Sequence, residues 1–579
     1  MVVPLSVIAT FLIRLRIRGL FPFSHFFQRW TLTLPGKENR AGRDKVSRTT
    51  INELNYHVLL NIFNWYRIDN TTEDSDGGWN LDRWWYKLVQ VCRVWRGIIL
   101  AHPTHLDLHL VCTYGTPVET MLSHSPPFPL TIYYPGKLGA VDAMSDEDKR
   151  GAIFVLRQRE RVRRVHIAAP AASLHDLVGA MDNEYPILQR LIIRSQAQRP
   201  ENHSDTRIRN RNRSDNVTVT LRAEFRAPLM HRLILSNVAI PTSSRLLSSA
   251  GSDLVWITLQ NLPASSPDFH PAHLTAQLGA LSRLEVLTVH FSVAIPNRDV
   301  RRRLQGASTT RVVLPRLRRL AYRGGSTYLE GILARLETPE LRTMNVEFFN
   351  QLSFSLPSLL QFARTTAFTF RSAELHFDQN FASLIVDPLD KHAGGDDGRR
   401  PHPLLMQVKG EPLDWQVTSI SQICSAIAPL LAQTEVLTLG FHKGGPDPAA
   451  AGTAEAGVAE AAAGWQGGDI AVDRAQWRAL LRIFAGVKTV QLTGGRVGDL
   501  FRAIQPRHSE SNNSGNGIGG GEDEGNGDGE DGGAFSPEIL PVLQKLALRG
   551  WGIADDVFNS FIAASDAAGR TVRLIRNKL

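Results

Sequence analysis

The sequence predicts a mixed α/β repeat protein, in which a small helical module precedes a long array of strand-and-helix units. Two observations predict this. Residues 51–110 contain two segments whose apolar side chains recur at helical spacing, and a short apolar phrase returns many times after residue 150. A chain of 579 residues is also too long for one compact core, so several folded units or an extended array are expected.

The composition is that of a globular protein, with 43% hydrophobic and 21% charged residues. The three cysteines, Cys92, Cys112 and Cys424, are far apart in the chain. This excludes a disulfide framework and a cysteine-based zinc cluster, and it suits a reducing compartment. The net charge of +9 combines separate basic and acidic stretches, so it does not by itself argue for nucleic acid. We expect a cytoplasmic or nuclear protein.

Residues 1–50 are expected to form an N-terminal extension that is disordered or peripheral. The apolar run at 2–13 is shorter than the roughly 20 residues that span a bilayer. Three arginines follow this run, whereas a secretory signal carries its positive charge before the apolar stretch. A working signal or anchor is the alternative. No later stretch is apolar enough to span, so no membrane partner is expected.

Two helical segments are predicted between residues 51 and 110. In the first, INELNYHVLLNIFNWYRI, apolar side chains recur at helical spacing (Leu54, Val58, Ile62 and Tyr66), and an acidic stretch at 69–78 ends the helix. The second, LDRWWYKLVQVCRVWRGIIL, places Trp84, Leu88, Cys92 and Trp95 on one stripe. Beyond Pro103, the alternation of Leu106, Leu108 and Leu110 with polar residues predicts a short strand.

After residue 150 a phrase of apolar, two variable, apolar, one variable and apolar residues keeps returning. Its clearest copies are Val162-Val165-Ile167, Leu188-Leu191-Ile193, Met230-Leu233-Leu235, Leu254-Ile257-Leu259, Leu284-Leu287-Val289, Leu317-Leu320-Tyr322 and Leu341-Met344-Val346. Weaker or later copies are Leu375-Phe377, Leu437-Leu439, Val490-Leu492 and Leu543-Leu546-Leu548. The end of each phrase predicts a strand, and the residues between copies often have helical spacing.

Strand-and-helix units of 20–29 residues are typical of leucine-rich repeats. The sequence therefore predicts an irregular leucine-rich-repeat solenoid over residues 151–579, after a connecting segment at 111–150. The period is loose, and the Asn or Cys that regular repeats place after the strand is mostly missing. The alternative is a chance recurrence of leucine-rich strands in an ordinary α/β protein.

Polar or small residues interrupt the array near residues 196–216, 390–403, 444–468 and 508–533. These stretches have too few apolar residues to offset the entropy of ordering them, so we expect mobile insertions. GNGIGG at 515–520 matches a dinucleotide-binding motif literally. It lies in an acidic, glycine-rich stretch that would repel phosphate, which makes the match an accident of composition.

Residues 51–110 resemble the F-box family, in particular the F-box-like proteins that are abundant in mushroom-forming fungi. The most specific phrase is LVQVCRVWRGIIL, with its Val91-Cys92-Arg93 and Trp95. Asn55 stands where the family usually has Pro, and Asn also caps helices well, so the first helix still begins there. The resemblance implies docking on the Skp-type adaptor of a cullin–RING (SCF-type) ubiquitin ligase. The side chains that it implies for docking are Leu54, Val58, Leu59, Ile62, Phe63, Leu88, Val91, Cys92, Trp95 and Ile99.

The predicted function is therefore a non-catalytic adaptor, which binds the Skp-type adaptor, and cullin through it, by the F-box-like module and an unknown target protein by the repeats. Exposed aromatic clusters are common at partner interfaces. The alternative for Trp84, Trp85 and Trp95 is that they pack against the repeats as core. A repeat scaffold without ligase attachment is the alternative function.

No catalytic constellation, cofactor site or metal site is predicted. His102, His105 and His109 lack a fourth ligand at suitable spacing, so polar residues on a solvated strand face are the simpler interpretation. Cys92 lies inside the apolar helix, where a thiol behaves as a small hydrophobe. The basic runs RQRERVRR (157–164) and RIRNRNR (207–213) favour a nucleic-acid binder most strongly. They lack interleaved aromatics, so solvated faces or a patch for an acidic partner are expected instead.

Overall fold

The computed structural model describes most of the chain from residue 54 onward. The described residues are 54–70, 84–136, 144–196, 219–241, 243–251, 253–262, 271–292, 311–349, 351, 353–365, 370–387, 404–410, 412–441, 474–493, 539–549, 562–563, 566 and 571–577. The predicted extension at 1–50, the basic run at 207–213 and GNGIGG at 515–520 lie outside these residues. The same holds for the predicted insertions near 196–216, 390–403, 444–468 and 508–533, except for Gln196.

The chain divides into two compact units. The first comprises residues 1–111 and 126–129, and the second comprises residues 112–125 and 130–579. The described helices of the first unit are α2 (Tyr56–Asn70), α3 (Trp84–Val89) and α4 (Arg93–Ala101). The expected start of α2 is confirmed, because Asn55 accepts a hydrogen bond from the His57 amide through Oδ1 at 3.0 Å.

The prediction of one continuous second helix is wrong, because the chain breaks between α3 and α4. Cys92 has extended backbone angles, and its Sγ accepts a hydrogen bond from the Trp95 amide at 3.4 Å. The cysteine therefore caps a new helix instead of continuing the old one. Apolar spacing is helical on both sides of the break, so the pattern alone did not show it.

The strand predicted around Leu106, Leu108 and Leu110 is also shorter than expected. All three leucines are buried, but strand structure begins only at β1 (Leu110–Cys112). Asp107 has φ 52, a left-handed conformation that Asp tolerates better than most residues. The amides of Leu106 and Leu108 donate to the carbonyl oxygens of His102 and Pro103, so this segment is a turn.

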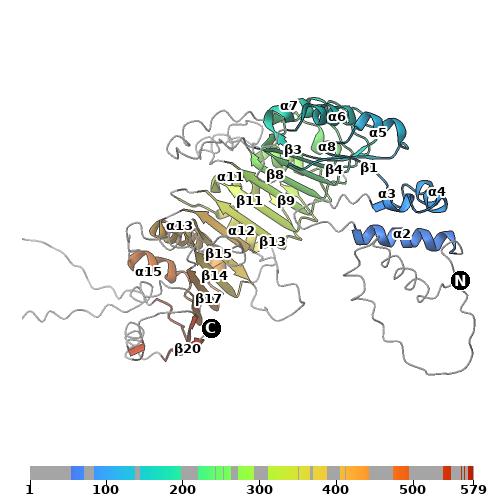
Figure 1. The fold of residues 1–579 in the computed structure, drawn as a ribbon. Coiled ribbons are helices and arrows are strands. Elements are labelled where there is room, and N and C mark those ends of the chain that lie inside the picture. The colour runs from blue at the N-terminus through green and yellow to red at the C-terminus, as the bar shows by residue number, and fades with distance from the viewer. Residues whose placement is uncertain are drawn as a thin grey trace, which may run out of the picture. The chain divides into compact units, whose positions relative to one another are not determined.

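The second unit is mixed α/β and is built on a large, mostly parallel sheet (Figure 1). Including β1, the sixteen described strands follow the order β1-β2-β3-β4-β6-β8-β9-β11-β13-β16-β15-β14-β17-β18-β19-β20. The others are β2 (Leu130–Tyr134), β3 (Val162–Pro170), β4 (Arg190–Gln196), β6 (Arg232–Ser236), β8 (Trp256–Leu262), β9 (Val286–Phe291), β11 (Arg319–Gly324), β13 (Thr343–Phe348), β14 (Ser372–Phe377), β15 (Phe381–Asp387), β16 (Leu404–Lys409), β17 (Val436–Phe441), β18 (Thr489–Thr493), β19 (Lys545–Arg549) and β20 (Arg573–Asn577). Two short pairs lie apart from it, β5 (Val219–Thr220) with β7 (Val238–Ala239) and β10 (Val312–Val313) with β12 (Leu336–Glu337).

The recurring apolar phrase forms two columns across this sheet. Its second position pairs in register from strand to strand, through Val165, Leu191, Leu233, Ile257, Leu287, Leu320 and Met344. Its third position does the same, through Ile167, Ile193, Leu235, Leu259, Val289, Tyr322 and Val346. All of these side chains are buried. Each copy of the phrase therefore supplies one parallel strand to a continuous core.

One stretch departs from the simple order. The strands β14, β15 and β16 occupy the sheet in reverse, so that β13 pairs with β16 and β14 pairs with β17. Between β2 and β20, only the pairs that β15 makes are antiparallel. The phrase at 375–377 lies on β14, as predicted, but β15 and β16 were not predicted as strands.

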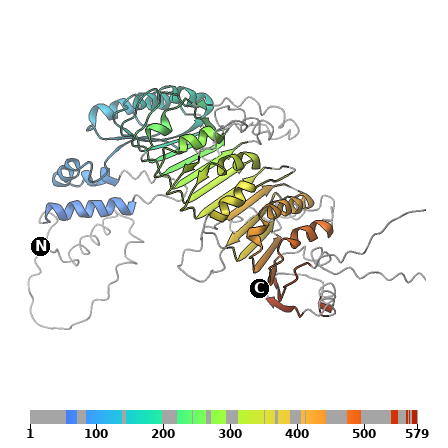
Figure 2. The same cartoon turned by 180° about the vertical axis from the view of Figure 1, so that it is seen from behind.

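The described helices of the second unit lie against one face of the sheet, as the two opposite views show (Figure 1, Figure 2). They are α5 (Val118–His124), α6 (Asp146–Leu156), α7 (Ala171–Gly179), α8 (Leu246–Ser249), α9 (Pro271–Leu278), α11 (Ser326–Leu333), α12 (Pro357–Thr365), α13 (Leu413–Ala426), α14 (Ala428–Leu431) and α15 (Arg474–Arg482). The two apolar columns point into this helix-covered core. Because side chains alternate along a strand, the residues between the columns point to the opposite face.

Candidate functional site

The interior of the helical module contains half of the side chains predicted to dock on an adaptor. Leu59, Phe63, Leu88, Trp95 and Ile99 are all buried. Phe63 of α2 and Trp95 of α4 meet with ring centroids 4.9 Å apart in an edge-to-face contact. These residues therefore hold the three helices together, and a direct role for them in docking stays a prediction.

The other predicted docking residues lie nearer the surface. Leu54, Val58, Ile62 and Cys92 are half-buried, and Val91 is 48% exposed. Trp84 and Trp85 are buried within the same unit, where Trp84 contacts Tyr66 and Trp85 contacts Phe128. The aromatic cluster is thus the core of the module, and the exposed apolar surface on and beside α4 is made by smaller side chains.

That surface is a stripe on α4 that the sequence analysis missed. Val94 is 57% exposed, and Gly97 and Ala101 follow it at spacings of three and four residues, also exposed. Side chains at this spacing share one face of a helix. A methyl group built on Gly97 would meet no atom within 4 Å, so the surface there is open. Val91 is exposed in the turn just before α4, and we call it together with Val94, Gly97 and Ala101 the α4 stripe.

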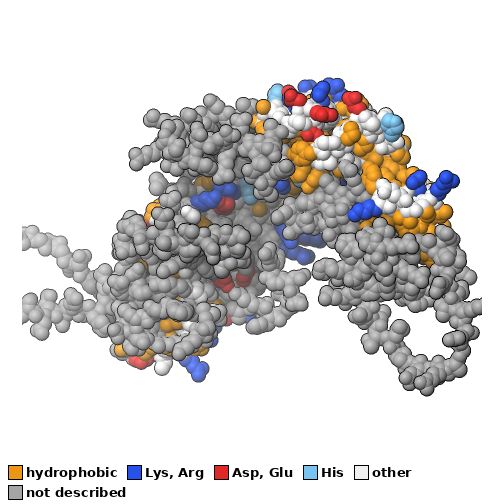
Figure 3. Space-filling model, in the orientation of Figure 1, with side chains coloured by type: hydrophobic (Ala, Val, Ile, Leu, Met, Phe, Trp, Pro, Cys, Tyr) orange, Lys and Arg blue, Asp and Glu red, His pale blue; other side chains and the backbone are white. Residues whose placement is uncertain are grey.

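Basic side chains flank the α4 stripe. Arg93 and Arg96 are exposed on the same helix, and the Arg96 Nε donates to the Val89 carbonyl oxygen at 3.0 Å. Figure 3 shows hydrophobic side chains with Lys and Arg beside them over the α3–α4 region. Among the described residues of this unit, Trp65 of α2 is a further exposed apolar side chain, at 63%. Small apolar side chains with a charged rim are common at protein–protein interfaces.

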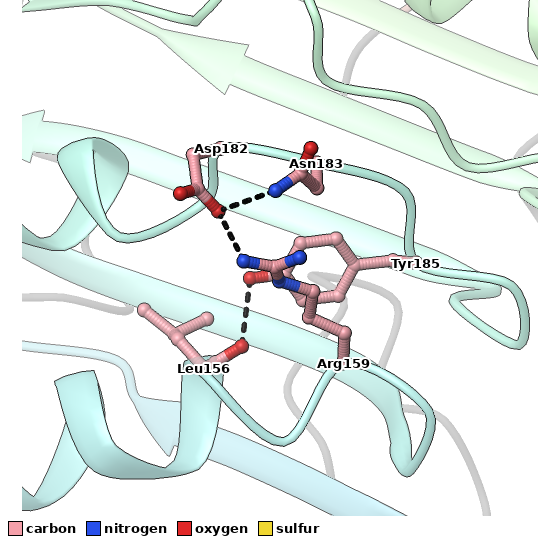
Figure 4. Close-up of polar contacts among 5 residues, drawn as sticks. All are labelled: Leu156, Arg159, Asp182, Asn183 and Tyr185. Carbon is pink, nitrogen blue, oxygen red and sulfur yellow. Dashed lines mark hydrogen bonds and ion pairs between the residues drawn. The ribbon is translucent and has the colours of Figure 1, made fainter.

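The arginines of the basic run at 157–164 have different positions. Arg159 joins two turns, and Arg164 lies on a strand of the sheet. Arg159 forms an ion pair with Asp182 at 2.8 Å, beside Asn183 (Figure 4). In the same view, the Tyr185 hydroxyl donates to the Leu156 carbonyl oxygen at 2.8 Å. These contacts join the turn after α6 to the turn before β4. Arg164, in contrast, lies on β3 and points to the face opposite the helices.

The histidines considered as metal ligands have other contacts. The His102 ring hydrogen-bonds to the Tyr56 hydroxyl and to the Ile98 carbonyl oxygen, and the His109 Nδ1 hydrogen-bonds to the Asp107 carbonyl oxygen at 2.9 Å. His105 is exposed. Within the described ranges, no group of three or more His, Cys, Asp or Glu side chains is placed to hold a metal ion.

No protein-family model matches the chain, and no curated protein matches its sequence. The F-box resemblance therefore rests on the residues of α2 to α4 themselves. None of the helices that the structure describes has the length and apolar character needed to cross a membrane.

Proposed function

We propose that the chain is the substrate-recognition subunit of an SCF-type ubiquitin ligase. In this proposal the helical module binds the Skp-type adaptor through the α4 stripe, and the sheet unit binds the target protein. The observation that carries it is the exposed apolar stripe on the helix with the most specific F-box-like phrase. Val91 and Val94 leave apolar surface in water there, while the tryptophans beside them in sequence are buried.

We also propose that the second unit is an irregular leucine-rich-repeat solenoid. Three features support this: the in-register apolar columns, the parallel pairing and the helices on one face. Asn237 and Asn261 add to it, because each has a positive φ directly after or within a strand. The Asn237 Nδ2 donates to the Ser195 carbonyl oxygen at 2.9 Å, which joins the residue after β6 to the end of β4. Asn shortly after the strand is also part of the leucine-rich-repeat pattern.

Affinity capture from fungal cells tests the ligase assignment. Wild-type protein should recover a Skp-type adaptor together with a cullin, and the variant Val91→Asp, Val94→Asp should lose both. Because both valines are exposed, charges there should leave the fold intact, whereas Asp at the buried Leu59 would unfold the module. The matched control is Thr120→Asp, Ser123→Asp, which adds the same two negative charges at exposed positions of α5.

Equal recovery of adaptor and cullin by wild type and by the Val91→Asp, Val94→Asp variant would exclude docking through the α4 stripe. Recovery of other partners alone, with neither adaptor nor cullin, would favour a repeat scaffold without ligase attachment.

A further inference from the structure

The helix α2 carries apolar side chains on two opposite sides. One side is core, with Leu59 and Phe63 buried inside the helical module. An α-helix turns by about 100° per residue, which places Trp65 about 160° around the helix from Phe63. Val58 and Ile62 lie within about 60° of Trp65, so these three side chains share the side of α2 that points away from the core. We call Val58, Ile62 and Trp65 the outer face of α2.

The outer face of α2 leaves apolar surface in water. Trp65 is 63% exposed, more than any other large apolar side chain of the described residues, and Val58 and Ile62 are half-buried. A helix that is apolar all round is normally buried all round. Tryptophan is also among the side chains most enriched at the centres of protein interfaces. The outer face therefore fits an apolar partner segment.

The sequence contains such a segment before α2. The run VVPLSVIATFLI at residues 2–13 has no charged side chain, and alone in water it would expose a contiguous apolar patch. The positions of α2 that flank the outer face are His57, Asn61 and Asn64, none of which is Asp, Glu, Lys or Arg. Covering the outer face with residues 2–13 therefore buries apolar surface on both sides of the contact without desolvating these charged groups.

We propose that residues 2–13 of the chain itself cover the outer face of α2. Forty residues, 14–53, connect the run to Leu54 and can extend to about 130 Å, whereas α2 is only about 22 Å long. The run can therefore reach every point of the outer face. Such a tether gives an effective concentration on the order of 0.1–1 mM, which favours this occupant over a second copy of the chain in dilute solution.

This inference goes beyond the proposed function and does not depend on it, because the contact is made within one chain. Val58 and Ile62 are also among the side chains that the F-box resemblance implies for docking. An adaptor that binds them would displace residues 2–13, so the test uses the chain without an adaptor.

Site-specific photocrosslinking of the purified full chain in dilute solution tests the proposal. Trp65→benzoylphenylalanine places the crosslinker on the outer face, and because this position is exposed, the fold should stay intact. Irradiation should join the crosslinker to residues 2–13 of the same molecule, which mass spectrometry of the digested monomer locates. The control Val313→benzoylphenylalanine, at a 49% exposed position of the second unit, should give no crosslink to residues 2–13.

Substitutions within the run separate a specific contact from random collisions of a tethered segment. Val7→Asp, Ile8→Asp should lower the crosslink yield from position 65 about tenfold or more, because two aliphatic side chains are no longer available for burial. The matched control Asn39→Asp, Thr49→Asp adds the same two charges to the connecting residues and should leave the yield unchanged. Both pairs precede α2 in the sequence and leave every buried side chain of the described core unchanged.

The inference is overturned if the crosslinker at position 65 does not reach residues 2–13, or reaches them only in a product of twice the chain mass, which joins two copies. Equal crosslink yields with and without Val7→Asp, Ile8→Asp would contradict it as well. Cosedimentation with phosphatidylcholine–phosphatidylserine vesicles that requires Val7 and Ile8, without the crosslink, would assign the run to a membrane surface instead.

Discussion

The pKa of His166 on β3 depends on the position of this residue in the sheet. It is 4% exposed and lies against the Tyr133 ring, with centroids 5.1 Å apart. Burial, together with the smaller effect of the positive charges of Arg194 and Arg232, lowers the pKa of His166 to about 4. The ring is therefore neutral at pH 7, and the arginines around it disfavour a proton.

The lowered pKa predicts a loss of stability in acid. The unfolded chain binds a proton at His166 below about pH 6.5, whereas the folded protein does so only near pH 4. The contribution of His166 to stability is thus complete above pH 6.5 and is lost as the pH falls toward 4, by up to about 3 kcal/mol. Urea unfolding between pH 7 and pH 4 should show a steeper decline for wild type than for His166→Gln. Parallel declines in the two proteins would contradict the assignment.

At the scale of elements, a side chain of α11 caps the start of α12. The Glu330 carboxylate of α11 accepts hydrogen bonds from the amides of Ser358, at 2.6 Å, and Leu359, at 3.0 Å. These are among the first amides of α12, which have no partner within their own helix. A carboxylate there also interacts favourably with the helix dipole. Burial raises the pKa of Glu330, and these hydrogen bonds act in the opposite direction.

We predict that Glu330→Ala lowers the free energy of unfolding by about 1–3 kcal/mol, because two amides then lose their acceptor. Glu330→Gln keeps an acceptor oxygen and should cost less. The exposed Glu340→Ala serves as a control, which should change stability by about 0.5 kcal/mol or less. Chemical denaturation of the three variants measures this. If Glu330→Ala and Glu340→Ala unfold at the same denaturant concentration, the cap has no energetic role.

The elements also show what the sequence could predict. The phrase at 230–235 predicted β6 and its buried leucines correctly, because alternation within a strand is local. The reversed placement of β14, β15 and β16 was not predictable in this way, since strand order depends on pairing between distant segments. In the helical module, spacing identified the helices but not which face is core. Leu59 and Val94 differ little as apolar helical residues, yet one is buried and the other exposed.

At the scale of the whole molecule, the proposed function assigns the two units to different partners. The helical module has a small apolar stripe on and beside α4, and the second unit has a large, mostly parallel sheet. A subunit that connects a ligase to a target needs two such independent surfaces. Substitutions on the α4 stripe are therefore expected to weaken adaptor binding and to leave the binding of the target unchanged.

Contact between the Skp-type adaptor and the α4 stripe is tested most directly by calorimetric titration of the purified adaptor into Gly97 variants. Because the space around Gly97 is open, Gly97→Ala and Gly97→Trp should both fold, with unchanged or slightly higher stability than the helical glycine gives. Adaptor binding should stay close to wild type for Gly97→Ala and should be at least about thirtyfold weaker for Gly97→Trp. Equal affinity of the adaptor for the folded Gly97→Trp variant and wild type would contradict it.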